Sequence, residues 1–324
     1  TDGVYFDIAK FPQYADFARL NLENLKEGAR VAKNTEKRNA SDFALWKFST
    51  KGVKRDMEWN SPWGKGFPGW HLECSTMALA KLGKTLDIHT GGIDHIPVHH
   101  TNEIAQSECH NGKAFANYWM HNSHILINGK KAAKSLGNAY TLNDIIRKGF
   151  SAEAFRLFVL QSHYRTESNF SWKNLEAAHN RLKRWKGLSS LIYQTAVFNS
   201  RSGDEIGLQI FESIDKIKEC LNNDLDTPGA LAVIENSFSM AEKYGINDKE
   251  ENYYSEFIKA INELLGLEIN SGDITDRQKS LLTQREQAKQ NKQWDISDSI
   301  REKLLKDGIV INDSKFGQIW HKQK

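Results

Sequence analysis

The hydrophobic pattern of the first half of the chain alternates between helical and extended spacing. Loop-forming Pro and Gly residues at 61–69 precede LECSTMALAKL (72–82), whose apolar residues recur at helical spacing and which stops at Gly83. TLDIHTGG (85–92) reads as a short apolar strand that ends in a glycine turn, and HHTNEIAQSECH (99–110) returns to helical spacing. This order of helix, strand, glycine turn and helix predicts an α/β fold with a site at the carboxyl end of the strand.

The second half has a different pattern. From about Ala152 to Leu265, helical runs such as ALAVIENSFSMAEKYG (230–245) dominate, and they predict an antiparallel helical bundle. From about Asp273 the sequence predicts one charged helix. GIVINDSKFGQIW (308–320) then predicts a small hairpin with NDSKFG as its turn region.

The first residues are less regular. We expect irregular structure, then a short helix over YADFARLNLENLKEGAR (14–30), then a partly buried apolar stretch, KRNASDFALWKFS (37–49). No apolar run is long enough to cross a membrane, and TDGVYFDIAK, which begins with Thr, is not a signal peptide.

Composition narrows the function classes. A chain of 324 residues favours two or three domains, and a net charge of +3 means that any nucleic-acid surface must be local. Three cysteines, Cys74, Cys109 and Cys220, form no disulfide framework and indicate a reducing, intracellular setting. Eight of the 11 histidines fall between His71 and His124, so we expect the chemistry to be concentrated there.

Three residues within this histidine-rich region form a candidate metal site. Cys74 begins a predicted helix, where the helix dipole favours a thiolate, and His99 and Glu103 are four apart on one helical face. Sulfur, nitrogen and carboxylate ligands together suit zinc. The alternative is a small buried cysteine and a solvated His/Glu pair, and spacing alone leaves this the commoner interpretation.

Longer motifs around these three residues favour the zinc interpretation. SPWGKGFPGWHLECSTMA (61–78), DIHTGGIDHIPVHHTNEIAQSE (87–108) and KKAAKSLGN (130–138) in this order resemble cysteinyl-tRNA synthetase, a class I aminoacyl-tRNA synthetase. The resemblance spans essentially the whole chain. It continues through YWMHN (118–122), RLFVLQSHYR (156–165), NNDLDTPGA (222–230) and the terminal GIVINDSKFGQIW.

The resemblance implies an α/β fold: the second half of a class I synthetase Rossmann-type domain, then an α-helical bundle and a small terminal α+β domain. The expected segments are a connective segment, 1–30; the carboxyl half of the Rossmann-type catalytic domain, 31–125; a stem-contact region with a KMSKS-like loop, 126–175; a helical tRNA/anticodon-binding bundle, 176–270; and a small terminal anticodon-binding domain, 271–324.

The resemblance also implies one zinc ion per active site, held by two cysteines, a histidine and a glutamate. Cys74, His99 and Glu103 match three of these ligands, and His100 is expected to be a supporting neighbour. The fourth ligand of the family precedes a HIGH signature that nothing in this sequence matches, and Cys109 is read, like the remaining cysteine, as structural. We therefore expect an amino-terminally truncated synthetase that is inactive, or nearly so, on its own.

In the family the zinc binds the thiolate of the substrate cysteine and so separates cysteine from serine. Trp70 matches an aromatic wall of the amino-acid pocket, with core packing as its alternative, and His89 matches a histidine near the bound cysteine. Both are expected to bind substrate.

Gly91, Gly92 and Asp94 in HTGGID resemble part of the adenylate site, because glycines allow close backbone approach and an acidic residue can bind ribose hydroxyls. Thr90 and His95 depart from the commoner family residues, so we expect no catalytic role for His95.

KAAKS (131–135) resembles the KMSKS loop, which closes over ATP and its Mg. Lys131, Lys134 and Ser135 match the family and are the expected catalytic residues, with Lys134 also binding the nucleotide. Two alanines replace the middle Met and Ser, so we expect altered packing or mobility of the loop and unchanged chemistry.

Two basic stretches, RLKRWKG (181–187) and RQKSLLTQREQAKQNKQW (277–294), are typical either of solvated helix faces or of tracks for RNA phosphates. The resemblance implies that the bundle and the terminal domain contact tRNA and its GCA anticodon. Arg301, Asp313 and Trp320 match tRNA-binding positions, and the alternative for Trp320 is to anchor the hairpin.

The expected function is that of a cysteine–tRNA ligase. It is expected to use ATP with Mg, L-cysteine and tRNA-Cys, in the cytoplasm, as a monomer without membrane contact. Two alternatives remain. One is a catalytically dead tRNA-binding paralogue; the other is a cysteine:amine ligase of the mycothiol type, whose members lack the full anticodon-binding end that this chain has.

Overall fold

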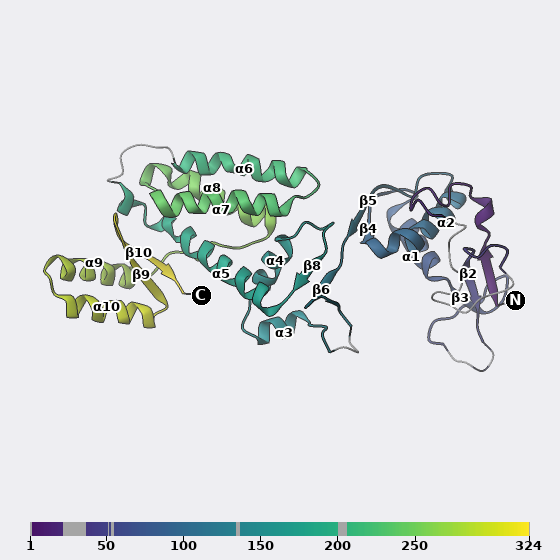
Figure 1. Cartoon of the computed structure of the whole chain (residues 1–324), viewed down its shortest axis with the longest axis horizontal. Helices are drawn as coiled ribbons and strands as arrows, with labels where there is room; N and C mark the ends of the chain where they lie inside the picture. Colours follow the sequence, from purple (N-terminus) through teal and green to yellow (C-terminus); the bar gives the residue numbers. More distant parts are fainter. Residues whose placement is uncertain are drawn as a thin grey trace. The chain divides into compact units, whose positions relative to one another are not determined.

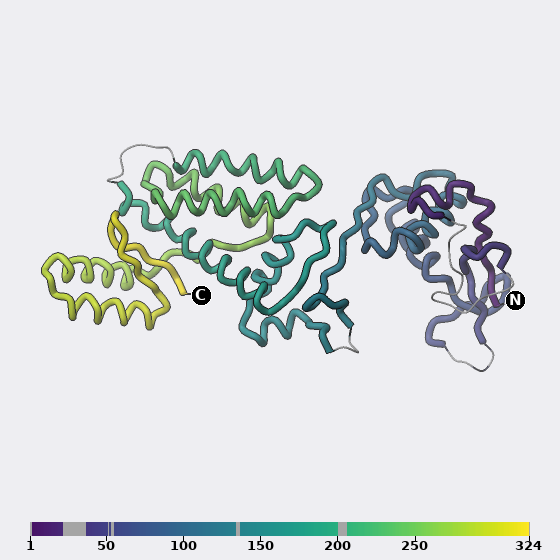
Figure 2. The backbone as a smooth tube through the Cα atoms, in the orientation of Figure 1, coloured from purple at the N-terminus to yellow at the C-terminus, as the bar shows by residue number. Residues whose placement is uncertain are grey.

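The computed structural model describes residues 2–21, 37–50, 52, 55–133, 137–199 and 206–323. The chain divides into two compact units, Thr1–His124 and Ile125–Lys324. Figures 1 and 2 trace the elements of each unit in chain order. Each unit has its own hydrophobic clusters, and each is described by itself.

The first unit begins with a small antiparallel sheet of order β1-β2-β3, formed by Gly3–Phe6, Phe43–Phe48 and Gly66–Pro68. The apolar stretch predicted over 37–49 is therefore a strand. Phe43 packs in a cluster with Tyr14 and with Ala105 of a later helix, which ties this sheet to the rest of the unit. The helix predicted over 14–30 is wrong for its described part, because residues 14–19 form turns; 22–30 lie outside the described residues.

The rest of the unit is a helix followed by a β-α-β crossover. Helix α1 (Trp70–Leu82) ends at Gly83, and strands β4 (Leu86–Gly92) and β5 (Ala116–Asn122) pair in parallel. Between them the chain runs through a 3₁₀ turn η3 (Ile93–His95), a π-helical turn η4 (Ile96–His100) and helix α2 (Thr101–Asn111). This is the predicted order, and it places the ends of β4 and β5 beside the start of α2.

The second unit opens with a three-stranded sheet, β7-β6-β8, made of Lys130–Lys131, Ile125–Ile127 and Ser168–Phe170. Between its strands lie α3 (Leu142–Arg147) and α4 (Ala152–Leu160). The bundle follows as α5 (Trp172–Ser189), η6 (Ser190–Tyr193), η7 (Thr195–Phe198), α6 (Ile206–Asn222), α7 (Thr227–Tyr244), η8 (Asp248–Glu250) and α8 (Glu251–Leu265). Figure 1 shows α6, α7 and α8 side by side, and one large apolar cluster fills their interior.

The terminal segment contains a helical pair and a hairpin. Helices α9 (Asp276–Gln290) and α10 (Trp294–Lys306) pack together, so the prediction of a single charged helix was wrong. Lys292, with a positive φ of 58°, lies in the short turn that separates them. Strands β9 (Ile309–Ser314) and β10 (Gly317–Lys322) form the predicted hairpin over a small core that includes Leu304 and Trp320.

Among the described residues, no helix is both long and apolar enough to cross a membrane.

Candidate metal and RNA-binding sites

Three elements of the first unit bring three different ligand atoms together. Cys74 comes from α1, His99 from η4 and Glu103 from α2, and their donor atoms all lie within 4.8 Å of one another. The π-helical turn directs both His99 and His100 to the interior, where both side chains are buried. The structure therefore assembles the three residues that the sequence analysis selected as metal ligands.

Of these three residues, Glu103 gives the strongest indication that a cation binds here. Its side chain is 0% exposed, and Oε1 has no hydrogen-bond partner among the described residues. Its other oxygen, Oε2, lies 2.9 Å from His89 Nε2 and 3.5 Å from His99 Nε2. A buried carboxylate oxygen without a partner is costly, and a divalent cation would satisfy it.

The neighbouring thiol differs from the expectation that the start of a helix would favour its thiolate, because α1 begins at Trp70 and Cys74 lies beyond its first turn. Burial raises the pKa of the Cys74 thiol, and the nearby Glu103 raises it further. A thiolate at this place therefore needs a cation beside it, as a metal ligand has. A sulfur, an imidazole nitrogen and a carboxylate oxygen fit zinc.

Glu103 also belongs to a second group of potential ligands, with His89 and His100, whose donor atoms lie within 4.8 Å of one another. His100 Nδ1 is 2.8 Å from His121 Nε2. Burial, followed by the neighbouring His89, lowers the pKa of His100 to about 3, so that its imidazole is neutral. Neutral imidazoles are the form that binds metals.

An outer layer of residues holds the ligands in place. His71 Nδ1 lies 2.8 Å from His99 Nδ1, which leaves His99 Nε2 on the side of Glu103. Gln106 Nε2 donates to the His71 carbonyl oxygen at 2.6 Å and to Ser75 Oγ at 2.6 Å. Burial, followed by His99, lowers the pKa of His71 to about 4. The sequence analysis missed His71 as a positioning residue, although the concentration of histidines pointed to its region.

Trp70 lies at the edge of this cluster. Its ring centroid is 4.4 Å from that of His99, yet the residue is 57% exposed. Core packing, the alternative interpretation of Trp70, therefore does not describe its environment. An exposed aromatic face beside a candidate metal ligand is a suitable wall for a small substrate.

The glycine turn at the end of β4 is shaped by the histidines. A Cβ on Gly91 would lie 2.6 Å from His100 Cε1 and 2.7 Å from His95 Nδ1, so no larger residue fits without a shift of both rings. A Cβ on Gly92 would lie 2.5 Å from Asp94 Oδ1. His95 thus lines the cluster, although we expected no catalytic role for it.

The KMSKS-like loop belongs to the second unit. Lys131 is exposed in β7, and its carbonyl oxygen accepts from Asn138 Nδ2 at 3.1 Å. Asn138 Oδ1 accepts from Ala133 N at 2.9 Å, so Asn138 joins the two ends of the loop. Lys134 and Ser135, the other two expected catalytic residues, lie outside the described residues.

The basic stretch 181–187 is largely neutralised within the bundle. Arg181 Nε donates to Glu235 Oε2 at 2.9 Å, and Arg184 pairs with both Glu235 and Glu242. Lys183 is exposed and forms no ion pair within the described ranges. Most of this stretch therefore serves helix packing.

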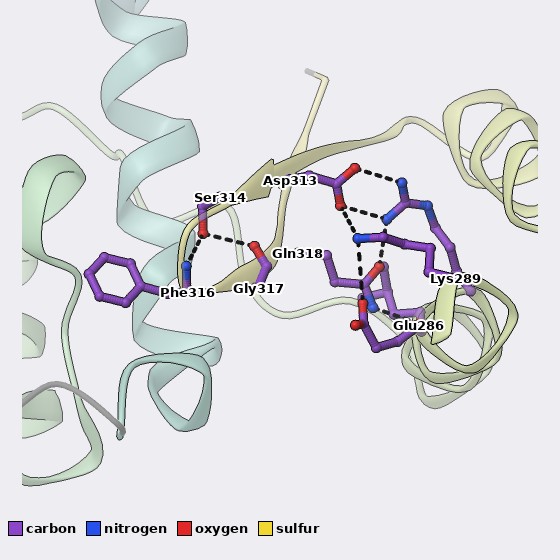
Figure 3. Close-up of polar contacts among 9 residues, drawn as sticks. Glu286, Lys289, Asp313, Ser314, Phe316, Gly317 and Gln318 are labelled. Carbon is purple, nitrogen blue, oxygen red and sulfur yellow. Dashed lines mark hydrogen bonds and ion pairs between the residues drawn. The ribbon is translucent and has the colours of Figure 1, made fainter. Parts of the chain in front are cut away.

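The three expected RNA contacts of the terminal domain lie in different environments. Arg301 is exposed on α10, and the carboxylate of Asp313 is held by Arg285 and Lys289 (Figure 3). Trp320 is only 4% exposed, and its ring stacks on Tyr193. Its backbone N–H donates to Gln194 Oε1 at 2.7 Å, which agrees with a role as the anchor of the hairpin. The sequence analysis did not single out Arg285.

Two family models match: the tRNA synthetases class I (C) catalytic domain over residues 1–180, and the cysteinyl-tRNA ligase anticodon binding domain over residues 271–320. A cysteine–tRNA ligase of Chlamydia felis is 40% identical over 322 residues, covering 97% of this chain and 68% of that protein. One from Treponema denticola is 38% identical over 348 residues, covering 99% of this chain and 69% of that protein.

A solved structure is similar in fold alone. It is a ternary complex of Agrobacterium radiobacter K84 agnB2 LeuRS with tRNA and LeuAMS, with a TM-score of 0.50 and 15% identity. The similarity covers 66% of this chain and 32% of that one.

Proposed function

The chain belongs to the cysteine–tRNA ligase family, and from this premise we propose that it supplies the cysteine-selecting and tRNA-contacting parts of an enzyme that charges tRNA-Cys. The overall reaction activates L-cysteine with ATP as cysteinyl-adenylate with release of pyrophosphate, and then transfers cysteine to the tRNA with release of AMP. The observation that carries the proposal is the buried, partly unsatisfied carboxylate of Glu103 beside Cys74 and His99.

Cys74, His99 and Glu103 are the residues that would hold one zinc ion. When bound, zinc supplies a soft Lewis acid that prefers the thiolate of cysteine to the hydroxyl of serine. This preference matters because shape alone separates such similar side chains weakly. The donor set of this chain, with sulfur and imidazole nitrogen, suits that ion.

His89 and Trp70 would shape the amino-acid pocket. His89 Nε2 lies 2.9 Å from Glu103 Oε2, so this imidazole orients the carboxylate while its ring packs edge-on against Trp119. Trp70 offers its exposed ring beside His99 as an apolar wall. Together the two side chains would orient a small amino acid and exclude water around its side chain.

The nucleotide would lie along the glycine turn at the end of β4. Gly91 and Gly92 form the backbone of this turn, and the exposed carboxylate of Asp94 can accept from ribose hydroxyls. For the KMSKS-like loop of the second unit we propose, as a separate point, that Lys131 and Lys134 interact with the phosphates of ATP and that Ser135 completes the loop. Mg would accompany ATP as its counter-ion.

The bundle and the terminal domain would contact tRNA-Cys. The match of residues 271–320 to an anticodon-binding domain model supports this role, and Arg301 and Asp313 are the exposed side chains proposed for it. For Trp320 we propose support of the hairpin that carries Asp313. We propose a monomer that works in the cytoplasm.

Charging assays separate this function from the two alternatives. The complete gene product should attach labelled cysteine to a tRNA-Cys transcript when ATP and Mg are present. A dead paralogue would bind that transcript without charging it, and a cysteine:amine ligase would consume ATP with cysteine and a small amine but leave the tRNA uncharged. Either of the last two results would overturn the proposed function.

A further inference from the structure

A buried arginine of the terminal domain holds an exposed carboxylate. Asp313 on β9 and Gln318 on β10 are directly paired across the hairpin, so their side chains lie on one face. Arg285, on α9, reaches both: Nη1 donates to Asp313 Oδ1 at 2.9 Å and to Gln318 Oε1 at 3.0 Å, and Nη2 donates to Asp313 Oδ2 at 2.9 Å. Figure 3 shows Asp313 and Gln318 on the hairpin, with Lys289 beside the Asp313 carboxylate.

The two members of this pair differ in exposure. The side chain of Arg285 is 3% exposed, whereas that of Asp313 is 45% exposed. The guanidinium group therefore cannot serve as an external contact, and its donors are directed inward at the hairpin. The Gln318 amide is fixed as well, because its Nε2 donates to the Leu282 carbonyl oxygen at 2.6 Å, which turns Oε1 to Arg285.

The Asp313 carboxylate has not used all of its acceptor positions within the described part of the chain. An ionised carboxylate offers about four acceptor positions. Oδ1 accepts from Arg285 and from Lys289 Nζ, the latter at 2.9 Å, whereas among the described residues Oδ2 accepts from Arg285 alone. One acceptor position of Oδ2 therefore remains, and the exposed part of the side chain is where a ligand can reach it.

We propose that Arg285 is a positioning residue for base reading, which fixes Asp313 so that one open acceptor on Oδ2 meets one N–H donor of an RNA base edge. This inference rests on the proposed tRNA-binding function of the terminal domain. A carboxylate oxygen fixed in one orientation favours a base that presents an N–H donor to it. It disfavours a base that presents an oxygen or an unprotonated nitrogen at the same position. The guanidinium group of Arg285 orients the carboxylate better than an ammonium group could, because its two parallel hydrogen bonds fix the plane of the carboxylate.

The ion pair stabilises the hairpin, but stability alone does not explain why the half-exposed Asp313 carboxylate is held in one orientation. Buried ion pairs are often no more stabilising than apolar residues of similar size, and Arg285 Nε has no hydrogen-bond partner within the described ranges. Burying an arginine with an unpaired Nε is unfavourable. Its bidentate contact with the half-exposed carboxylate is therefore better explained by the orientation that it imposes on Asp313.

The test measures binding of RNA hairpins to the full 324-residue chain. One hairpin carries the GCA anticodon, and the others replace each anticodon base in turn. Arg285→Lys should reduce discrimination at one anticodon position about tenfold, leaving the other positions and the salt dependence of binding unchanged. Arg277→Lys is the matched control, since it makes the same exchange at an exposed position of α9 that does not contact Asp313, and it should retain discrimination. Hydrogen exchange in β9 and β10 reports whether each variant keeps the hairpin folded.

Asp313→Asn separates failure of this inference from failure of the proposed function. If Asp313→Asn removes discrimination and Arg285→Lys does not, Arg285 is not a positioning residue, although the anticodon role of the domain survives. A uniform loss of affinity in Arg285→Lys with a folded hairpin would also overturn the inference. If neither variant changes discrimination at any position, Asp313 does not read the anticodon, and this part of the proposed function fails.

Discussion

At the scale of single residues, the carboxylate of Glu103 organises the first unit. It is fully buried, three imidazole Nε2 atoms lie within 3.9 Å of its Oε2, and its Oε1 has no partner in the described part of the chain. Such an environment contains ligand atoms and little else that could neutralise a buried charge. We therefore expect metal content to depend on the individual members of this group.

Cys74→Ser should lower the zinc content of the purified protein, because a neutral hydroxyl replaces a thiol that becomes a strong zinc ligand when deprotonated. Metal analysis by mass spectrometry measures the effect. Cys109→Ser is the matched control, since Cys109 is exposed on α2 and belongs to neither group of potential ligands. Equal zinc content in the two variants would remove Cys74 from the site.

His71→Ala should weaken zinc binding about 10- to 100-fold, the usual effect of removing a residue that orients a metal ligand. The physical reason is the 2.8 Å contact between the Nδ1 atoms of His71 and His99, which fixes the ring of His99. Competition with a chelator measures the affinity. His110→Ala, at an exposed position next to Cys109 at the end of α2, should bind zinc as the parent does. An unchanged affinity in His71→Ala would show that α1 and η4 alone orient His99.

At the scale of elements, the sequence predicted the local order well and the tertiary contacts poorly. The spacing of His99 and Glu103 placed both on one helical face, because i and i+4 are neighbours along any helix. The contact of His89 with Glu103 spans 14 positions and that of His71 with His99 spans 28, and no local rule relates such distant residues.

Each of the two wrong predictions has its own physical cause. The apolar pattern over 14–30 is compatible with a helix, but Tyr14 is buried in a cluster with Phe43, and residues 14–19 turn to reach it. The charged terminal helix is interrupted at Lys292, whose left-handed conformation ends α9. Neither a tertiary contact nor a single strained residue is visible in hydrophobic periodicity.

The end of α7 depends on one glycine. Gly245 has φ of 75°, and a Cβ there would lie 1.8 Å from Phe198 Cδ1. Gly245→Ala should therefore lower the free energy of unfolding by roughly 2 to 4 kcal/mol, from the left-handed conformation and from overpacking. Urea denaturation followed by circular dichroism measures the change.

Gly149→Ala is the control for this change. Gly149 has φ of 89° but no atom within 4 Å of the added Cβ, so it should cost only about 1 kcal/mol. Equal effects of the two substitutions would mean that Phe198 moves aside without cost.

The terminal hairpin should lose stability in acid. Hydrogen bonds from Arg285 hold the pKa of Asp313 well below its ordinary range, so the ionised carboxylate stabilises the folded state above about pH 4. That contribution is lost as the pH falls through the folded-state pKa. The amides of β9 and β10 should therefore be better protected from hydrogen exchange in the parent than in Asp313→Asn. This difference in protection should be large at pH 7 and small below about pH 4.

Asp307→Asn is the control for the acid experiment, because this exposed residue after α10 forms no ion pair within the described ranges. It should match the parent at both pH values. A difference in protection for Asp313→Asn that stays constant with pH would contradict the account, since it would reflect the shape of the side chain and not its charge.

At the scale of the whole molecule, the chain combines a metal-ligand cluster in Thr1–His124 with a helical bundle and hairpin in Ile125–Lys324. It spans 68 to 69% of the length of the curated relatives with which it was compared. The expectation that these 324 residues alone form no cysteinyl-adenylate stays a prediction, and pyrophosphate exchange by the isolated chain checks it.

The most direct test of the central claim is amino-acid-dependent ATP–pyrophosphate exchange by the complete gene product, with cysteine and serine compared in the parent and in Glu103→Gln. The account predicts exchange with cysteine and almost none with serine, and loss of the cysteine signal together with zinc in Glu103→Gln. Exchange that is equally fast with both amino acids, or that persists in a zinc-free Glu103→Gln protein, would contradict it.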